Sequence, residues 1–143
     1  MSTCEINSFK GEYKWLSNML ICTFRYRGVA WKSVEHFYQA MKTIDVKERE
    51  SIRCVYSPYE AKKMGKGITI RADFADLKIS IMREGIKAKF TQNKALGKLL
   101  VDTGDIKIVE GNYWNDTYWG VCRGVGQNNL GILLMELRGE LRK

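Results

Sequence analysis

The chain has 143 residues, a length typical of one domain, and its 45% hydrophobic and 28% charged residues are ordinary for a globular protein. A chain of this length can bury a hydrophobic core without disulfides or metals, and its single proline excludes a proline-rich linker, so we expect one domain over residues 1–143. With 24 Lys and Arg against 16 Asp and Glu, the net charge is +8, which favours anionic partners, although a basic surface kept for solubility is an equal alternative.

The first third of the chain is expected to form strands and turns, followed by helices. Residues 22–31 (CTFRYRGVAW) combine β-forming residues with a central Gly28, as a short hairpin does. Ser33 is a suitable N-cap for a helix over residues 34–43. A short helix over residues 47–55 follows.

The middle of the chain carries two further helix start signals. Ser57-Pro58 provides a capping residue and a proline at the first helical position, which predicts a helix that continues over residues 59–64 and ends at Gly65. Asp73 can cap the next helix, over residues 74–90, whose apolar residues recur at helical spacing.

The C-terminal third mixes short helices with strands. Residues 95–101 predict a short helix, residues 106–110 and 117–121 predict strands beside a polar turn, and residues 130–141 predict an amphipathic helix. The expected fold class is therefore α+β and predominantly α-helical, a single compact domain with a small antiparallel β-sheet.

The cysteines and the apolar segments exclude several kinds of protein. The chain has four cysteines, none of them in a CxxC pair: Cys4, Cys22, Cys54 and Cys122. A thiolate metal site of the usual spacing is therefore not expected. No signal-peptide pattern is present, and the apolar stretch over residues 15–24 is too short to span a bilayer. We expect a cytoplasmic protein with reduced cysteines, mostly in the core, and no membrane association.

Residues 33–42 (SVEHFYQAMK) contain the first candidate functional group. On a helix, Glu35, Gln39 and Lys42 line one face, where an acid, an amide and a cation can bind a sugar, a hydroxyl and a phosphate. A purely structural explanation also exists for Glu35 and for Lys42. An acid in a first turn suits the helix dipole, and a lysine at a helix end is often solvated. His36, the only histidine, is expected to be a hydrogen-bonding residue in or near the core.

Residues 110–120 (EGNYWNDTYWG) form a second candidate group, with four aromatic residues around one turn. Aromatic faces stack on a nucleobase, and Asn or Asp side chains hold ribose hydroxyls. Asn115-Asp116 also suits a plain hairpin turn. The crowding of aromatic residues favours the functional interpretation.

A glycine-rich loop over residues 124–131 leads into the last helix and forms a third candidate group. Glycines let a backbone approach a ligand closely, and a helix N-terminus offers N–H groups to a phosphate. The loop fits neither a Walker A nor a Rossmann pattern. One or two members of a basic group could also hold phosphates, although most are expected to be solvated: Arg49, Arg53, Lys62, Lys63, Lys66 and Arg71.

Taken together, these segments resemble motifs of the NADAR family, also called YbiA-like, in order along nearly the whole chain. Residues 33–42 resemble the family's "SEHxxQAxK" helix, and residues 115–120 (NDTYWG) resemble its "NDxxWG" segment. Shorter matches are Leu16-Ser17-Asn18, residues 61–65 (AKKMG), Lys89-Phe90, residues 99–104 (LLVDTG) and residues 128–135 (NNLGILLM). Ordered matches of this kind are far more specific than any single motif.

The resemblance implies a single YbiA-like domain with N-glycosidase activity. Members of the family cleave N-ribosidic bonds in phosphorylated ribosyl compounds; some act on riboflavin-pathway intermediates, and others remove ADP-ribose from guanine bases. The family's essential glutamate falls on Glu35 and its essential aspartate on Asp116, and neither a metal nor another cofactor is expected. Phe74 stands where the family often has a tryptophan, and Gln127 where a lysine is frequent.

Cleavage of an N-ribosidic bond develops positive charge at the anomeric carbon, and two carboxylates can share the work. Because the helix dipole favours an ionised acid in the first turn, Glu35 is expected to act as a carboxylate that orients water or stabilises the cation. Asp116 would bind ribose or assist as the partner acid. Ten further residues are candidates for binding the substrate: Asn18, His36, Gln39, Lys42, Phe74, Tyr118, Trp119, Gly126, Asn128 and Asn129.

The expected substrate carries ADP-ribose on a guanine base, in a nucleotide or in nucleic acid, and the chain is expected to act as a monomer. Three alternatives stay open. The chain could cleave ribosylaminopyrimidine phosphates of the riboflavin pathway, it could bind ADP-ribose or a related nucleotide without cleaving it, or it could bind unmodified nucleic acid with a strong dependence on salt.

Overall fold

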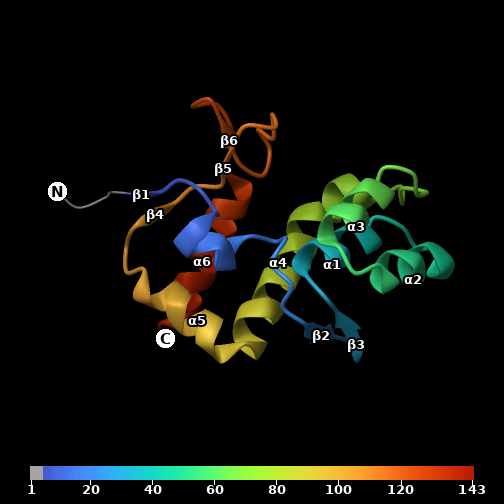
Figure 1. Ribbon diagram of the computed structural model, residues 1–143, viewed down its shortest axis with the longest axis horizontal. Coiled ribbons are helices and arrows are strands. Elements are labelled where there is room, and N and C mark those ends of the chain that lie inside the picture. Colours follow the sequence, from blue (N-terminus) through green and yellow to red (C-terminus); the bar gives the residue numbers. More distant parts are fainter. Residues whose placement is uncertain (1–4) are drawn as a thin grey trace. The chain divides into compact units, whose positions relative to one another are not determined.

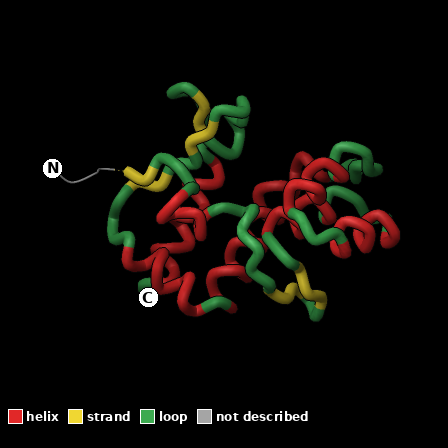
Figure 2. The backbone as a smooth tube through the Cα atoms, viewed as in Figure 1, coloured by secondary structure: helices red, strands yellow, loops and turns green. Residues whose placement is uncertain are grey.

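Helices make up most of the regular structure, and short paired strands lie between them (Figures 1 and 2). The computed structural model describes residues 5–143. The helices are η1 (Gly11–Leu16, a 3-10 helix), α1 (Val34–Ala40), α2 (Val46–Cys54), α3 (Pro58–Met64), α4 (Phe74–Gln92), α5 (Lys94–Asp102) and α6 (Asn129–Leu141). The strands are β1 (Glu5–Ile6), β2 (Phe24–Tyr26), β3 (Val29–Trp31), β4 (Lys107–Ile108), β5 (Gly111–Asn112) and β6 (Val121–Cys122). The predicted α+β, predominantly helical class is confirmed.

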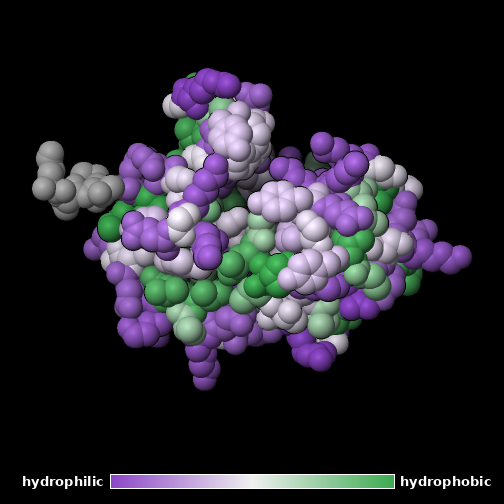
Figure 3. All heavy atoms as spheres, viewed as in Figure 1, coloured by the Kyte–Doolittle hydropathy of each residue, from purple (hydrophilic) through white to green (hydrophobic). Residues whose placement is uncertain are grey.

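The chain folds into two compact units. One combines the N-terminal residues up to Ser17 with Lys94–Lys143, and we call it the terminal unit; the other is Asn18–Asn93, the central unit. Hydrophilic residues cover much of the face in Figure 3, interrupted by groups of hydrophobic ones. Within the part of the chain that the structure describes, no helix combines the length and the apolar character needed to cross a membrane.

The central unit begins with the predicted hairpin. Strands β2 and β3 pair antiparallel, with Phe24 opposite Trp31. The two turn residues, Arg27 at φ 50° and Gly28 at φ 81°, both have left-handed backbones. Two such residues in succession are the hallmark of the turn that matches the twist of a two-residue hairpin, which explains why a glycine stands here.

Helix α1 is the centre of this unit and packs on α2, α3 and α4. All seven of its residues are buried, and the Ser33 side chain caps it by accepting a hydrogen bond from the His36 backbone N–H. The helix ends at Ala40 rather than at the predicted residue 43. The physical reason is the buried Thr43, whose hydroxyl donates to Glu48 at 2.7 Å and so turns the chain into α2.

The other helix starts of the central unit were predicted with mixed success. Ser57 caps α3 by accepting from the Tyr59 N–H at 3.2 Å, with Pro58 in the first turn, as the sequence indicates. Asp73 does precede α4, but its side chain does not cap the helix. It accepts instead from the Arg71 guanidinium, at 2.7 Å, because this charged pair competes with the backbone N–H groups.

Two buried or half-buried reactive groups also lie in the central unit. Lys89 is 1% exposed, and burial lowers the pKa of its ammonium to about 7. Burial also raises the pKa of the half-buried Cys22 thiol, and the positive charge of Lys89 opposes that rise. Of the other cysteines, Cys122 is buried as expected, Cys54 is exposed, and Cys4 lies outside the described residues.

In the terminal unit, α6 packs against α5 and against β4, which pairs parallel with β1. The buried Arg138 of α6 stabilises this arrangement by donating to the Thr103 hydroxyl at 2.9 Å and to the Ile106 carbonyl at 2.7 Å. Strands β5 and β6 also pair in parallel, so among the described strands only the β2–β3 hairpin is antiparallel.

The predicted strands at residues 106–110 and 117–121 are much shorter than expected. Only Lys107–Ile108 and Val121–Cys122 are extended and paired. Gly120 explains part of the difference, because a Cβ there would lie 2.1 Å from the Glu110 carbonyl oxygen. The backbone before β6 bends to make this approach, and its carbonyl groups bond to the start of α6 instead of to a strand.

The two serine caps provide a test of how α1 is held. Ser57→Ala removes one capping bond and is expected to lower the free energy of unfolding by roughly 1 kcal/mol. Ser33→Ala also removes the partner of the buried His36 Nδ1, 2.7 Å away, which adds about 1–3 kcal/mol. Urea unfolding of both variants measures whether Ser33→Ala loses more stability than Ser57→Ala. Equal losses in the two variants would contradict this prediction.

Candidate active site

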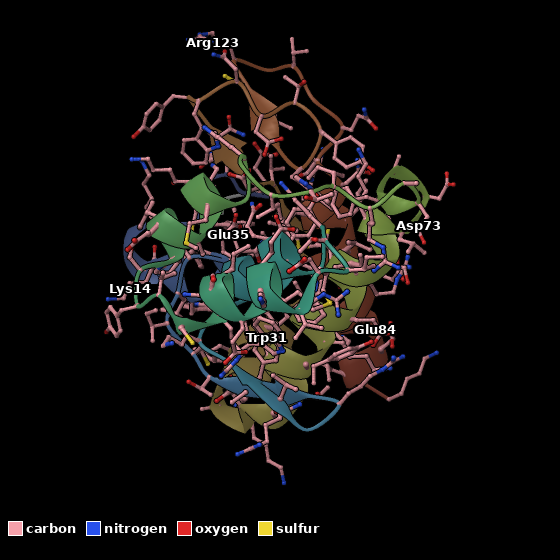
Figure 4. The ribbon with its side chains drawn as sticks, turned by 90° about the vertical axis from the view of Figure 1, so that its right-hand side faces the viewer. Lys14, Trp31, Glu35, Asp73, Glu84 and Arg123 are labelled. Atoms are coloured by element: carbon pink, nitrogen blue, oxygen red, sulfur yellow. The ribbon has the colours of Figure 1, made fainter. Side chains whose placement is uncertain are left out.

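The Glu35 side chain is held inside the central unit by its own helix. Glu35 lies in the first turn of α1 and is 7% exposed. The Gln39 side chain, one turn later, donates its amide N–H to Glu35 Oε2 at 2.6 Å. The Glu35 backbone N–H donates to the Asn18 carbonyl at 3.2 Å. The structure therefore brings together three residues that the sequence predicts for one site, and Figure 4 shows where Glu35 lies.

Lys42 follows α1 and lies against two aromatic rings. Its Nζ is 5.4 Å from the centre of the Tyr38 ring and 5.9 Å from that of Phe74, and the two rings are 5.6 Å apart. Burial lowers the pKa of the Lys42 ammonium, the negative charge of Glu35 opposes that effect, and three neighbouring lysines add to it. An anionic ligand would relieve this crowding of positive charge.

Two residues that are hydrogen-bonded to Glu35 each have an amide oxygen that accepts no hydrogen bond among the described residues. These oxygens are Asn18 Oδ1 and Gln39 Oε1, and both are buried. A buried polar atom without a partner costs about 1–3 kcal/mol, so such atoms often mark a place where a ligand supplies the missing donor. A ribose hydroxyl is a donor of this kind.

Gly65 is a positioning residue that the sequence analysis did not single out for the site. A Cβ at Gly65 would lie 1.8 Å from Gln39 Oε1. The backbone of Gly65 is ordinary helical, at φ −60°, so the glycine is needed for space and not for conformation. Its place in the AKKMG segment was the available signal, but only the packing of α3 on α1 shows what it touches.

His36 points away from this group and has a structural role. It is fully buried; its Nε2 donates to the Val55 carbonyl at 2.8 Å, and the Ser33 hydroxyl lies 2.7 Å from its Nδ1. Burial lowers the pKa of the imidazole and so favours the neutral ring, while the hydrogen bond to the Val55 carbonyl opposes this shift. His36 thus ties the start of α1 to the end of α2.

Asp116, the second predicted catalytic residue, lies in the terminal unit and organises a turn. Its Oδ1 accepts from the backbone N–H groups of Tyr118 at 3.1 Å and Trp119 at 2.8 Å. The Asn112 side chain clamps the Asp116 backbone by accepting from its N–H and donating to its carbonyl. No described residue donates to Asp116 Oδ2, and the residue is only partly buried, so this oxygen can accept from a ligand.

The aromatic residues after Asp116 form a packed pair. The Tyr118 and Trp119 rings are 4.9 Å apart and perpendicular, and both residues are partly exposed. Asn129 is linked to the same turn, because its side chain donates to the Tyr118 carbonyl at 2.9 Å. Three of the predicted binding residues therefore lie together beside Asp116.

Two further predicted binding residues, Asn128 and Gly126, make contacts within the protein. The Asn128 side chain accepts from the Glu110 N–H and donates to the Ile108 carbonyl, both at 2.9 Å. A Cβ at Gly126 would lie 2.1 Å from the Gly120 carbonyl oxygen, so the close backbone approach that requires this glycine is to Gly120.

The expectation that the start of α6 offers free N–H groups to a phosphate is wrong. The backbone N–H groups of residues 127–130 donate to the carbonyls of residues 117, 120, 118 and 119. The glycine-rich loop lies against the turn that contains Asp116, and these bonds occupy the first two N–H groups of α6, those of Asn129 and Leu130, which a helix start otherwise exposes.

Glu110, at the start of the second candidate group, is a buried acid for which the sequence predicts no individual role. It is 8% exposed, and its Oε1 accepts from the Asn112 side chain at 3.3 Å, the same amide that donates to the Asp116 carbonyl. Its burial could not be predicted, because it depends on Gly120 and on the loop before α6. In the residues that the structure covers, no cluster of three or more His, Cys, Asp or Glu could hold a metal ion.

Comparison with known proteins identifies relatives for nearly the whole chain. A profile of the NADAR domain matches residues 7–142. The N-glycosidase YbiA of Escherichia coli (strain K12) is 40% identical over 137 residues, which cover 94% of this chain and 85% of the relative. The NMR structure of E. coli YbiA matches with a TM-score of 0.88 at 38% identity, over 99% of this chain and 88% of that one. A riboflavin biosynthesis protein of Vibrio vulnificus is 33% identical over 90% of this chain but only 36% of its own length.

The contact between Gly65 and Gln39 can be tested by stability. Gly65→Ala is expected to lower the free energy of unfolding by roughly 1–3 kcal/mol, because the added methyl group displaces the Gln39 amide. The matched control is Gly67→Ala, whose Cβ would meet only the Met64 carbonyl at 3.8 Å. Replacing Gln39 by alanine as well should remove the Gly65→Ala penalty. Equal effects of the two glycine substitutions would disprove the contact.

The neutral state of His36 predicts a pH dependence of stability. The unfolded imidazole titrates at its ordinary pKa of 6.5, whereas burial lowers the pKa of the folded one. Below pH 6.5 the unfolded chain therefore binds a proton that the folded chain does not, and the free energy of unfolding falls as the pH falls. Urea unfolding above and below this pH should show the decrease, and His36→Gln should reduce it. An unchanged slope in the variant would rule out His36 as the cause.

Proposed function

The chain belongs to the NADAR domain family, and on this premise we propose that it is an N-glycosidase that hydrolyses an N-ribosidic bond in an ADP-ribose-type or phosphoribosyl substrate. The observation that carries the proposal is the buried Glu35 carboxylate, held by the Gln39 amide beside the Lys42 cation. The name of the E. coli relative, N-glycosidase, supports the reaction class.

Glu35 acts as the catalytic carboxylate. The Gln39 amide donates a hydrogen bond to the Glu35 carboxylate, and the positive charge of Lys42 lies nearby. Both favour the ionised form of Glu35, as does the helix dipole at the start of α1. A fixed negative charge in a site shielded from water stabilises the oxocarbenium character that develops as the N-ribosidic bond breaks, or it orients the attacking water.

Asp116 is the second carboxylate of the reaction. Two backbone N–H groups orient its Oδ1 and hold its carboxylate in place. The other oxygen then accepts a ribose hydroxyl or assists the departing base. The rings of Tyr118 and Trp119 supply faces for stacking on that base.

The proposed substrate carries ADP-ribose on a guanine base. The net charge of +8 and the crowded lysines around Lys42 favour a ligand with several phosphates. The orphaned oxygens of Asn18 and Gln39 favour one with hydroxyl donors. An ADP-ribosyl group meets both requirements, whether it is attached to a free nucleotide or to nucleic acid, and the chain acts on it without a metal.

A second substrate class follows from one of the relatives. The Vibrio vulnificus relative is named a riboflavin biosynthesis protein, which makes ribosylaminopyrimidine phosphates the next candidates. A non-catalytic module that only binds ADP-ribose is the remaining alternative. Phe74, which keeps the aromatic contact with Tyr38 but has no N–H donor, is the residue that favours this alternative.

Parallel assays of base release test the proposal. The protein is offered ADP-ribosyl-guanosine, ADP-ribosylated DNA and a ribosylaminopyrimidine phosphate, with free base and ribosyl product measured by chromatography. We expect turnover of the guanine substrates. Glu35→Gln should lose on the order of 10² to 10⁴ in rate, because the ionised carboxylate is removed while the size of the side chain and one oxygen that can accept from Gln39 are kept.

The control is Glu60→Gln, which also replaces a first-turn glutamate, in α3, but an exposed one. This variant should keep wild-type turnover. Near-normal turnover in folded Glu35→Gln would refute the role of Glu35. If calorimetry shows tight binding of ADP-ribose and the assays show no base release, the chain is a non-catalytic binding module and not an enzyme.

A further inference from the structure

A cavity of about 570 Å³ lies within the central unit, on the other side of α1 from Glu35. Phe37 of α1 and Met41, which follows the helix directly, contribute to its wall, whereas Glu35, Gln39 and Lys42 do not line it. At about 100° per residue, Phe37 is about 200° around the helix from Glu35. Figure 4 shows Trp31 and Glu84, two residues of the cavity wall, below Glu35 in the view.

One wall of the cavity is aromatic and closely packed. The Phe37 ring packs edge-on against Tyr26, with centres 4.9 Å apart, and against Trp31 at 5.7 Å. Gly85 of α4 lies directly behind Phe37, since a Cβ there would come within 2.9 Å of the ring. The Trp31 indole N–H has no acceptor among the described residues, although Trp31 is 4% exposed. A flat apolar ring suits such a wall.

Arginines stand on another wall of the same cavity. Arg49 donates its Nε–H to the Thr43 carbonyl at 2.7 Å, and none of the acids that the structure describes forms a salt bridge with it. Burial lowers the pKa of Arg49, and the nearby positive charge of Arg71 lowers it further. Arg71 is paired only with the half-exposed Asp73. Two neighbouring guanidinium groups, one without a counter-ion, suit a phosphate.

We propose that this cavity binds a small phosphorylated aromatic molecule of mononucleotide size, with its phosphate on Arg49 and Arg71 and its ring against Tyr26 and Trp31. The volume lies within the roughly 300–1,000 Å³ usual for small-ligand sites. The Glu84 carboxylate, also on the wall, can accept from sugar hydroxyls. This binding site is separate from the proposed glycosidase site and does not depend on that activity.

Titration of the full-length protein with AMP, followed by ¹H–¹⁵N NMR, tests the proposal. The Trp31 indole N–H signal is the reporter, assigned by its loss in Trp31→Phe. We expect AMP to shift this signal, and adenosine and inorganic phosphate to bind at least about 10-fold more weakly, since each makes half of the contacts. Arg49→Gln should weaken AMP binding by roughly 10- to 100-fold.

Two controls separate this site from the glycosidase site. Arg83→Gln removes an exposed arginine of α4 that does not line the cavity, and Glu35→Gln removes the proposed catalytic carboxylate; both should keep the wild-type affinity for AMP at this signal. If Arg49→Gln does not fold, Ser80→Trp, which fills the cavity from an exposed position on α4, should abolish the shift instead. An unshifted Trp31 signal at millimolar AMP, or binding lost in Glu35→Gln but kept in Arg49→Gln, would overturn the proposal.

Discussion

Helix α1 is buried along its whole length, and the polar side chains on it must therefore find partners inside the protein. Ser33 and His36 bond to each other, and His36 reaches the end of α2. Gln39 donates to Glu35. Because a buried polar group without a partner is costly, these hydrogen bonds restrict how this short helix can sit among its neighbours, and among these side chains only Gln39 Oε1 accepts no bond from the described residues.

The same constraint determines how the neighbouring elements approach. Gly65, directly after α3, leaves room for the Gln39 amide, and Gly85 of α4 leaves room for the Phe37 ring on the opposite side. Each glycine permits a contact that a methyl group would prevent. One face of α1 thereby carries a fixed carboxylate, and the other carries an aromatic wall beside two arginines, so the two proposed sites are built on opposite faces of a single helix.

Much of the local structure could be predicted from the residues, because its causes are local. Three features depend only on residues close together in the chain. They are the hairpin around Gly28, the serine caps of α1 and α3, and the alignment of Glu35 with Gln39. The prediction for Asp73 is wrong for the opposite reason. Its carboxylate can accept either from the backbone N–H groups at the helix start or from Arg71, and the sequence does not indicate which donor it binds.

The sequence by itself determined the fold class, the position of Glu35 in a first turn and the membership of a family. Only the tertiary structure decided which groups are still available to a ligand. The N–H groups at the start of α6 are occupied by the turn after Asp116, whereas Asn18, Gln39 and Arg49 keep unused bonding capacity. The physical reason is that hydrogen-bond satisfaction depends on segments far apart in the chain, whose approach no local pattern encodes.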